Sequence, residues 1–227
     1  MSMREAIRQV RDAAQTLNAR GPKPFPIVVQ GLEAVIVGGV LGVERKDWIV
    51  PGQRERVGAV LRGCPVERLT DASLGARPYR VAPVSLDPAN RLLHAVGLSL
   101  AERDRATLCF IGQGSASCGA FHEALNLAAL HRVNLILVAH TWNLDEPGAP
   151  LARQLAGTLA SKALAFGVHA TTVDGGLVTA VLSAVAEARA HGGPHLIEAR
   201  LHRGDDPLRR AEEELTEHEP SAVAQTG

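Results

Sequence analysis

The chain has 227 residues, of which 46% are hydrophobic and only 3% are aromatic. This composition supports one large domain whose core consists mainly of Ala, Val and Leu. Lysine plus arginine and aspartate plus glutamate both number 24, so the formal net charge is zero. Phosphate binding requires a basic surplus, and the charge balance therefore excludes nucleic acid as the main partner.

The cysteines and the N-terminus indicate a cytoplasmic protein. The three cysteines have no metal-ligand spacing and form no disulfide framework, which fits a reducing compartment. Cys109 lies in an apolar run and should be a buried small hydrophobe. The charged N-terminus lacks the apolar core of a signal peptide, and no apolar run approaches about 20 residues, so we expect no membrane partner.

The first expected elements are a helix, a proline-rich arm and a helix of small residues. Apolar residues at helical spacing predict a helix over residues 4–18, and the three prolines within residues 21–26 predict an ordered arm or a linker. Residues 31–43 should form a helix despite their glycines, which lower helix propensity. These glycines favour tight packing at a subunit interface, and an irregular helix is the alternative; they are Gly38, Gly39 and Gly42.

A short strand and a second helix follow. Residues 47–50 should be extended, and residues 53–61 should form a helix that begins near Arg54. An arginine at a helix start can hold a phosphate, because the dipole and the guanidinium act together, and a solvated arginine is the alternative. Residues 64–90 have an irregular pattern, with one short strand expected over residues 81–86.

The central part of the chain predicts one βαβ unit. An apolar helix over residues 92–102 comes first. The βαβ unit then consists of a strand (107–111), the turn Gly112–Gln113–Gly114, a helix (121–130), a strand (135–139) and the polar cluster 140–143. Ligands of open parallel sheets bind just beyond the carboxyl ends of strands. We therefore expect the functional site at these two strand ends.

The remaining pattern continues the alternation of helices and strands. Helices are expected over residues 151–166 and 177–190, and strands over residues 167–173 and 195–201. The alternation predicts an α/β fold, a mostly parallel sheet with helices on both faces. The expected organisation is an N-terminal helix and arm (1–26), one α/β domain (27–204) and a charged tail (205–227) that should fray or be disordered.

Several segments, in order, resemble the alpha subunit of thiamine-diphosphate-dependent 2-oxoacid dehydrogenases of the pyruvate and branched-chain type. The similar segments are Gly31–Ala34 (GQEA in the family), Asp47–Pro51 with Gln53–Glu55 (D-aromatic-x-x-P and YRE), His94–Gly97 (HAVG), Phe121–Asn126 after Gly119, Val173–Gly175 (VDG) and Pro194–Ala199 (PTLIEA). Several matches in one order are more specific than any single motif.

The resemblance implies the thiamine-diphosphate-binding fold of the PP type, with thiamine diphosphate and Mg²⁺ as cofactors. It also implies a homodimer or a beta-type dehydrogenase subunit as partner. In this family the alpha subunit supplies the diphosphate and metal half of the cofactor site. The positions that the resemblance assigns to cofactor binding are Arg54, Gly112, Gln113, Gly114, Ser115, Trp142 and Asn143.

The departures from the family fall on the cofactor site. The Tyr of the family's YRE is Gln53 here, its GIVG stretch falls on residues 86–89, and the metal-binding motif has changed most. The family's GDG turn carries a metal-ligating Asp where this chain has Gln113, and its NN pair, whose second Asn is a ligand, falls on Thr141 and Trp142. Mg²⁺ between two phosphates requires hard oxygen donors, and an indole offers none. Asn143 lies one residue late, and a one-residue slip along a strand reverses the direction of a side chain.

These departures predict a protein that keeps the fold without the usual cofactor site. We assign no catalytic residue and no metal ligand. The first hypothesis is a non-catalytic or structural subunit. The second is a working alpha subunit of a pyruvate, branched-chain or acetoin dehydrogenase, which decarboxylates its substrate with thiamine diphosphate and a beta subunit. A new acid–base or metal site at His140, with Asp145 and Glu146, is a third and weaker alternative.

Overall fold

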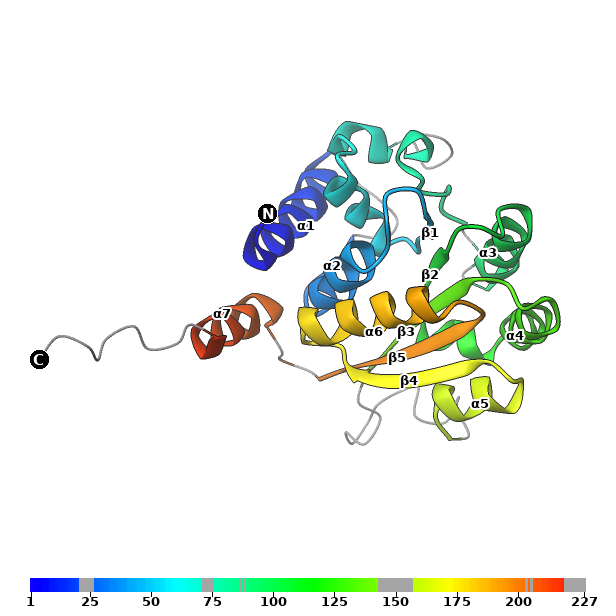
Figure 1. The fold of residues 1–227 in the computed structure, drawn as a ribbon. Coiled ribbons are helices and arrows are strands. Elements are labelled where there is room, and N and C mark those ends of the chain that lie inside the picture. The colour runs from blue at the N-terminus through cyan, green and yellow to red at the C-terminus, as the bar shows by residue number, and fades with distance from the viewer. Residues whose placement is uncertain are drawn as a thin grey trace, which may run out of the picture.

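One parallel sheet organises the protein (Figure 1). The computed structural model describes residues 1–20, 27–70, 76–85, 87, 89–142, 157–202, 204 and 206–218. The sheet within these residues has the order β1-β2-β3-β5-β4, and every pair is parallel. The strands are β1 (Trp48–Val50), β2 (Thr107–Gly112), β3 (Leu135–Trp142), β4 (His169–Asp174) and β5 (His195–Leu201). The predicted α/β class with a parallel sheet is confirmed.

Helices cover both faces of the sheet, as predicted. One face carries α2 (Glu33–Leu41) and α6 (Val178–His191), and the other carries α3 (Asn90–Ala101), α4 (Gly119–His131) and α5 (Leu159–Ala165). Outside α2 lie α1 (Met3–Ala19) and α7 (Pro207–His218). Short 3-10 helices connect these elements: η1 (Glu55–Arg62), η2 (Val66–Thr70), η3 (Arg77–Tyr79) and η4 (Gln113–Ser117). Among the described residues, no helix combines the length and apolar character that a membrane crossing requires.

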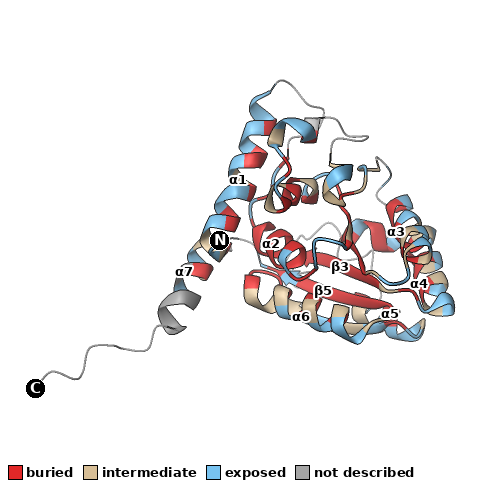
Figure 2. Ribbon diagram, turned by 45° about the horizontal axis from the view of Figure 1, so that its top comes forward, coloured by how far each residue is buried: buried red, intermediate tan, exposed pale blue. Residues whose placement is uncertain are grey.

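The central strands β2, β3 and β5 are buried on both faces, and β2 and β3 accordingly have nearly continuous apolar sequences (Figure 2). The edge strand β4 is largely exposed. Alternate residues of a strand point to opposite faces. In β2, Leu108 and Phe110 join the core under α2 and α6, whereas Cys109 and Ile111 join the core under α3 and α4. Cys109 is therefore the buried small residue that the sequence predicted.

The glycine-rich helix α2 packs inside this chain, and not at a subunit interface as predicted. A methyl group added at Gly38 would lie 2.7 Å from Cβ of Val181 in α6, and one at Gly39 would lie 2.6 Å from the ring of Phe110. The glycines thus let α2 approach α6 and the sheet closely. The irregular-helix alternative is also wrong, because residues Glu33–Leu41 are regularly helical.

A buried aspartate joins the amino ends of β1 and β2 to the end of α6. Asp47 has no exposed surface and accepts hydrogen bonds from the Ala106 amide at 3.1 Å and the Glu44 amide at 2.8 Å. Arg189 of α6 donates to the same carboxylate at 2.6 Å. The pKa of Arg189 is raised, mainly by this hydrogen bond with Asp47.

Two other expectations differ from the structure. The tail was expected to fray from residue 205, yet α7 is helical, and Arg210 binds Asp174 at 2.7 Å. The strand expected over residues 81–86 is reduced to one bridge between Val81 and Ile49. Residues 21–26 and 151–156, on which an arm and part of a helix were expected, lie outside the described residues. The proposed domain boundaries stay a prediction.

Candidate functional site

The carboxyl ends of β1, β2 and β3 border a cavity of about 410 Å³. Because neighbouring parallel strands end at the same edge of the sheet, residues far apart in sequence meet there. The described residues that line this cavity, called the strand-end cavity below, are Gln53, Arg54, Glu55, Ser85, Arg91, Gly112, Gln113, Gly114, Ser115, His140 and Trp142. This cavity lies at the strand ends where the sequence predicted a functional site.

A buried, hydrogen-bonded histidine and glutamate form one wall of the strand-end cavity. His140 near the end of β3 and Glu55 at the start of η1 are 8% and 4% exposed, and His140 Nε2 lies 2.9 Å from Glu55 Oε1. A methyl group added at Gly112, the register partner of His140, would lie 3.2 Å from the imidazole Cε1. The glycine at position 112 therefore leaves room for the histidine ring beside Glu55.

The environment of Glu55 favours its ionised form. Burial raises the pKa of this carboxyl, but the hydrogen bond and charge of His140, with the charge of Arg91, lower it to about 2. Arg91 of α3 is only 6% exposed, and its Nε has no partner among the described residues. Glu55 carries the one carboxylate among the described lining residues, and it is already engaged.

Gln113 is the first residue of η4, directly after β2. Its side chain is 3% exposed, and neither its amide oxygen nor its amide nitrogen has a hydrogen-bond partner among the described residues. Its neighbour Ser115 is buried as well and lines the same cavity. An unpaired buried amide is uncommon, and this one lines the cavity, where it can bind a polar group.

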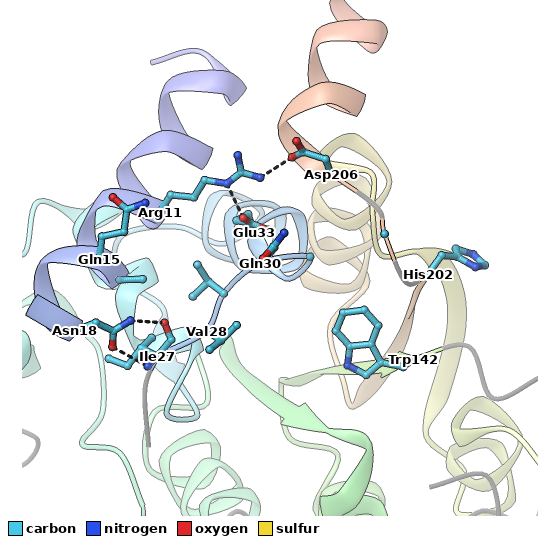
Figure 3. Close-up of a pocket in the computed structure, with 14 residues that line it drawn as sticks. Arg11, Gln15, Asn18, Ile27, Val28, Gln30, Glu33, Trp142, His202 and Asp206 are labelled. Atoms are coloured by element: carbon cyan, nitrogen blue, oxygen red, sulfur yellow. Dashed lines mark hydrogen bonds and ion pairs between the residues drawn. The ribbon is translucent and has the colours of Figure 1, made fainter. Parts of the chain in front are cut away.

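Trp142, the last residue of β3, separates the strand-end cavity from a second one. A methyl group added at Gly31, at the entry to α2, would lie 3.0 Å from the indole Cη2, so the ring packs against the Gly31 backbone. Trp142 lines the strand-end cavity and also a cavity of about 700 Å³ between α1, residues 27–33 and the start of α7. Figure 3 shows the indole at the lower side of this second cavity.

An ion-pair cluster closes the far side of the second cavity (Figure 3). Arg11 of α1 lies 2.6 Å from the fully buried carboxylate of Glu33 and 2.5 Å from that of Asp206. Burial lowers the pKa of Arg11, but the hydrogen bonds with Glu33 and Asp206 raise it more. The cluster fixes α1, α2 and the start of α7 relative to one another.

Most predicted site residues meet in the strand-end cavity. It brings together Arg54, Gly112, Gln113, Gly114, Ser115 and Trp142, and Asn143 lies outside the described residues. The sequence reasoning missed Arg91, and it did not connect Glu55 with His140. Arg91 had a signal, because it precedes the apolar Ala95 by four residues and so shares the inward stripe of α3.

Solved structures with this fold are thiamine-diphosphate-dependent enzymes. A Mycobacterium smegmatis protein described as a thiamin diphosphate-dependent enzyme has a TM-score of 0.50 and 21% identity, covering 74% of this chain and 31% of that chain. A transketolase from Campylobacter jejuni has a TM-score of 0.65 and 17% identity, covering 95% of this chain and 42% of that chain. The predicted thiamine-diphosphate-binding fold is confirmed.

The sequence comparison gives the family. A family model described as dehydrogenase E1 component matches residues 1–207, and the chain belongs to this family. The 3-methyl-2-oxobutanoate dehydrogenase subunit alpha of Mycobacterium tuberculosis is 34% identical over 82% of this chain and 57% of its own length. The 2-oxoisovalerate dehydrogenase subunit alpha of Bacillus subtilis is 30% identical over 94% of this chain and 75% of its own length.

The chain is shorter than some of these relatives. The pyruvate dehydrogenase E1 component subunit alpha of Staphylococcus aureus is 32% identical over 86% of this chain and 58% of its own length. The chain thus spans less than two thirds of the M. tuberculosis and S. aureus proteins. The predicted likeness to a 2-oxoacid dehydrogenase alpha subunit is confirmed.

Proposed function

We propose that this chain keeps the scaffold of a 2-oxoacid dehydrogenase alpha subunit and acts as a non-catalytic subunit. The proposal concerns the metal half of the cofactor site. Its residues do not fit Mg²⁺ bound to a diphosphate, which requires several hard oxygen donors in octahedral geometry. No reaction step is therefore assigned to this chain.

The observation that carries the proposal is the pair of side chains at the ends of β2 and β3. Gln113 offers one neutral amide oxygen where the family resemblance places a carboxylate, so a full negative charge is lost from the metal position. Trp142 offers no oxygen at all, and its indole occupies the opposite wall against Gly31. Glu55 does not replace the missing carboxylate, because His140 holds it at 2.9 Å.

The cationic side of the strand-end cavity is retained. Arg54 lines the cavity at the start of η1, and the buried Arg91 has an unpaired Nε. Such donors bind phosphate groups without a metal ion. Among the matched positions, those that should contact Mg²⁺ are now Gln113 and Trp142, whereas the phosphate-holding Arg54 remains, so the loss falls more on the metal than on the anion.

This selectivity separates the proposal from the alternative of a working alpha subunit. Calorimetric titration with thiamine diphosphate, with Mg²⁺ or with EDTA, measures the contribution of the metal directly. We expect the dissociation constant to change by less than about threefold between the two conditions, since the metal adds no contact. Binding that is more than about tenfold tighter with Mg²⁺ would sink the proposal and favour the working enzyme.

A paired reversion tests the assignment to these two residues. The double variant Gln113→Asp, Trp142→Asn restores the oxygen donors of the family motif and should make binding depend on Mg²⁺. The matched control is His131→Asn, which alters an exposed side chain at the end of α4, outside the strand-end cavity. If the double variant remains indifferent to Mg²⁺, residues beyond Gln113 and Trp142 determine the loss.

The relatives' printed names as subunits support the partner part of the proposal, a beta-type dehydrogenase subunit or a second copy of this chain. Co-purification with a beta-type subunit, followed by light scattering, measures the composition of the assembly. The assembly should form and should show no decarboxylation of 2-oxoacids. Activity that this chain restores to an isolated beta subunit would contradict the non-catalytic role.

A further inference from the structure

Three histidines form a cluster at the edge of the sheet opposite the strand-end cavity. His169 begins β4, His195 begins β5, and His191 ends α6, which leads directly into β5 (Figure 1). Their ring centroids are 4.5 Å (His169–His191), 4.8 Å (His169–His195) and 4.9 Å (His191–His195) apart. One nitrogen of each ring lies within 4.8 Å of a nitrogen of the other two.

The backbone fixes this arrangement. His169 and His195 are register partners in the parallel pair β4 and β5, so their side chains stand side by side. Residues of β5 on the same side as His195, such as Ile197, belong to the core under α6. The connection from α6 to β5 turns through Gly192 and Gly193, whose positive φ values of 74° and 79° bring His191 over this end of the sheet.

Backbone carbonyls orient two of the three rings. His191 Nδ1 lies 2.9 Å from the Gly192 carbonyl oxygen, and His195 Nδ1 lies 3.3 Å from the Gly193 carbonyl oxygen. A carbonyl oxygen only accepts hydrogen bonds, so each Nδ1 carries the proton. The lone pair of each neutral ring is then on Nε2. Metal-binding histidines are oriented in this way, by a second hydrogen bond to a carbonyl or carboxylate.

Two further features favour a cation at the cluster. His191 is the last residue of α6, where the helix dipole places partial negative charge. Burial lowers the pKa of His195, and the charges of His169 and His191 lower it further, against the effect of the Gly193 hydrogen bond.

We propose that His169, His191 and His195 bind a divalent transition-metal ion of the zinc class, with water in the remaining position. Three imidazole nitrogens and one water form a common tetrahedral set for this metal. Tetrahedral zinc requires nitrogen atoms about 3.3 Å apart, against up to 4.8 Å here, so the exposed His169 and His191 rings would turn on binding. The site is independent of thiamine diphosphate and lies away from Gln113 and Trp142.

Zinc titration of the tag-free chain tests this site. Calorimetry should give one zinc ion per chain, and Co²⁺ as a probe should give visible ligand-field absorption that zinc abolishes. His169→Ala and His191→Ala should each weaken zinc binding about 100-fold, because each removes a ligand from an exposed position where folding does not depend on it. The matched control His131→Ala removes the last residue of another helix, α4, and should leave the affinity unchanged.

The melting temperature is a second measurement, which shows whether each variant is folded. Zinc should raise the melting temperature of the wild type and of His131→Ala, and it should leave that of His191→Ala unchanged. Equal zinc affinity in the wild type, His169→Ala and His191→Ala would overturn the proposal, because the ion would then bind elsewhere. The absence of zinc binding by the wild type at neutral pH would overturn it as well.

Discussion

Replacing Glu55 by glutamine should lower the free energy of unfolding by roughly 3 kcal/mol at neutral pH. The substitution keeps the size of the side chain and removes the charge that His140 and Arg91 stabilise. The pKa of Glu55 is about 2 in the fold, against an ordinary value of 4.5. That difference of about 2.5 units, at about 1.36 kcal/mol per unit, gives the expected loss.

The loss should depend on pH in one direction. Because the folded state lowers the pKa of Glu55, the carboxylate contributes its full stabilisation above 4.5 and loses it as the pH falls from 4.5 toward 2. Urea unfolding of both chains, followed by circular dichroism, measures this difference across the pH range. The two stabilities should differ most above pH 4.5 and converge in acid.

Two results would refute this reasoning about Glu55. One is a difference below about 0.5 kcal/mol at neutral pH, the size expected of an ordinary surface change. The other is a difference that does not shrink in acid. Glu123→Gln is the control, because Glu123 is exposed on α4 and should produce no such pH-dependent loss.

Three further changes test the packing. Asp47→Asn should lower the free energy of unfolding by about 2–3 kcal/mol in urea, because Arg189 loses its buried carboxylate partner and keeps only the exposed Glu44 at 2.8 Å. An unchanged unfolding midpoint would contradict this. Gly39→Ala should lower the free energy of unfolding by about 1–3 kcal/mol, because the added methyl group would collide with the Phe110 ring. Gly97→Ala is the control, because the space around Gly97 is open, and it should leave stability unchanged or raise it. Equal effects of the two substitutions would argue against close packing at Gly39. A thiol reagent should label the exposed Cys118 rapidly and leave the buried Cys109 unlabelled, since burial raises the pKa of Cys109 to about 12; fast labelling of both would contradict the buried position.

The sequence predicted the sheet well because the strand signals are local. The runs at residues 107–111 and 135–139 are apolar on both faces, which is typical of buried parallel strands. The turn at Gly112–Gly114 and the polar end of β3 then placed the site at the strand ends. This step required only the rule that neighbouring parallel strands end at one edge.

The predictions that the sequence missed or got wrong depend on contacts between residues far apart in the chain. Glu55 and His140 are 85 positions apart, so no local pattern connects them. The glycines of α2 indicated a close neighbour correctly, but their spacing does not say whether that neighbour belongs to the same chain. The helicity of α7 was missed because its composition is polar and its partners are remote, as in the Arg11–Asp206 pair 195 positions apart.

The position of Trp142 also makes the molecule easy to observe. The chain has two tryptophans, and Trp48 lies at the first residue of β1 with Arg80 5.0 Å from its ring centroid. Trp142, in contrast, adjoins both cavities. In a Trp48→Phe chain, one fluorophore would remain, and its emission would respond to ligands that arrive on either side. The fluorescence of Trp142 would thus report binding in either cavity.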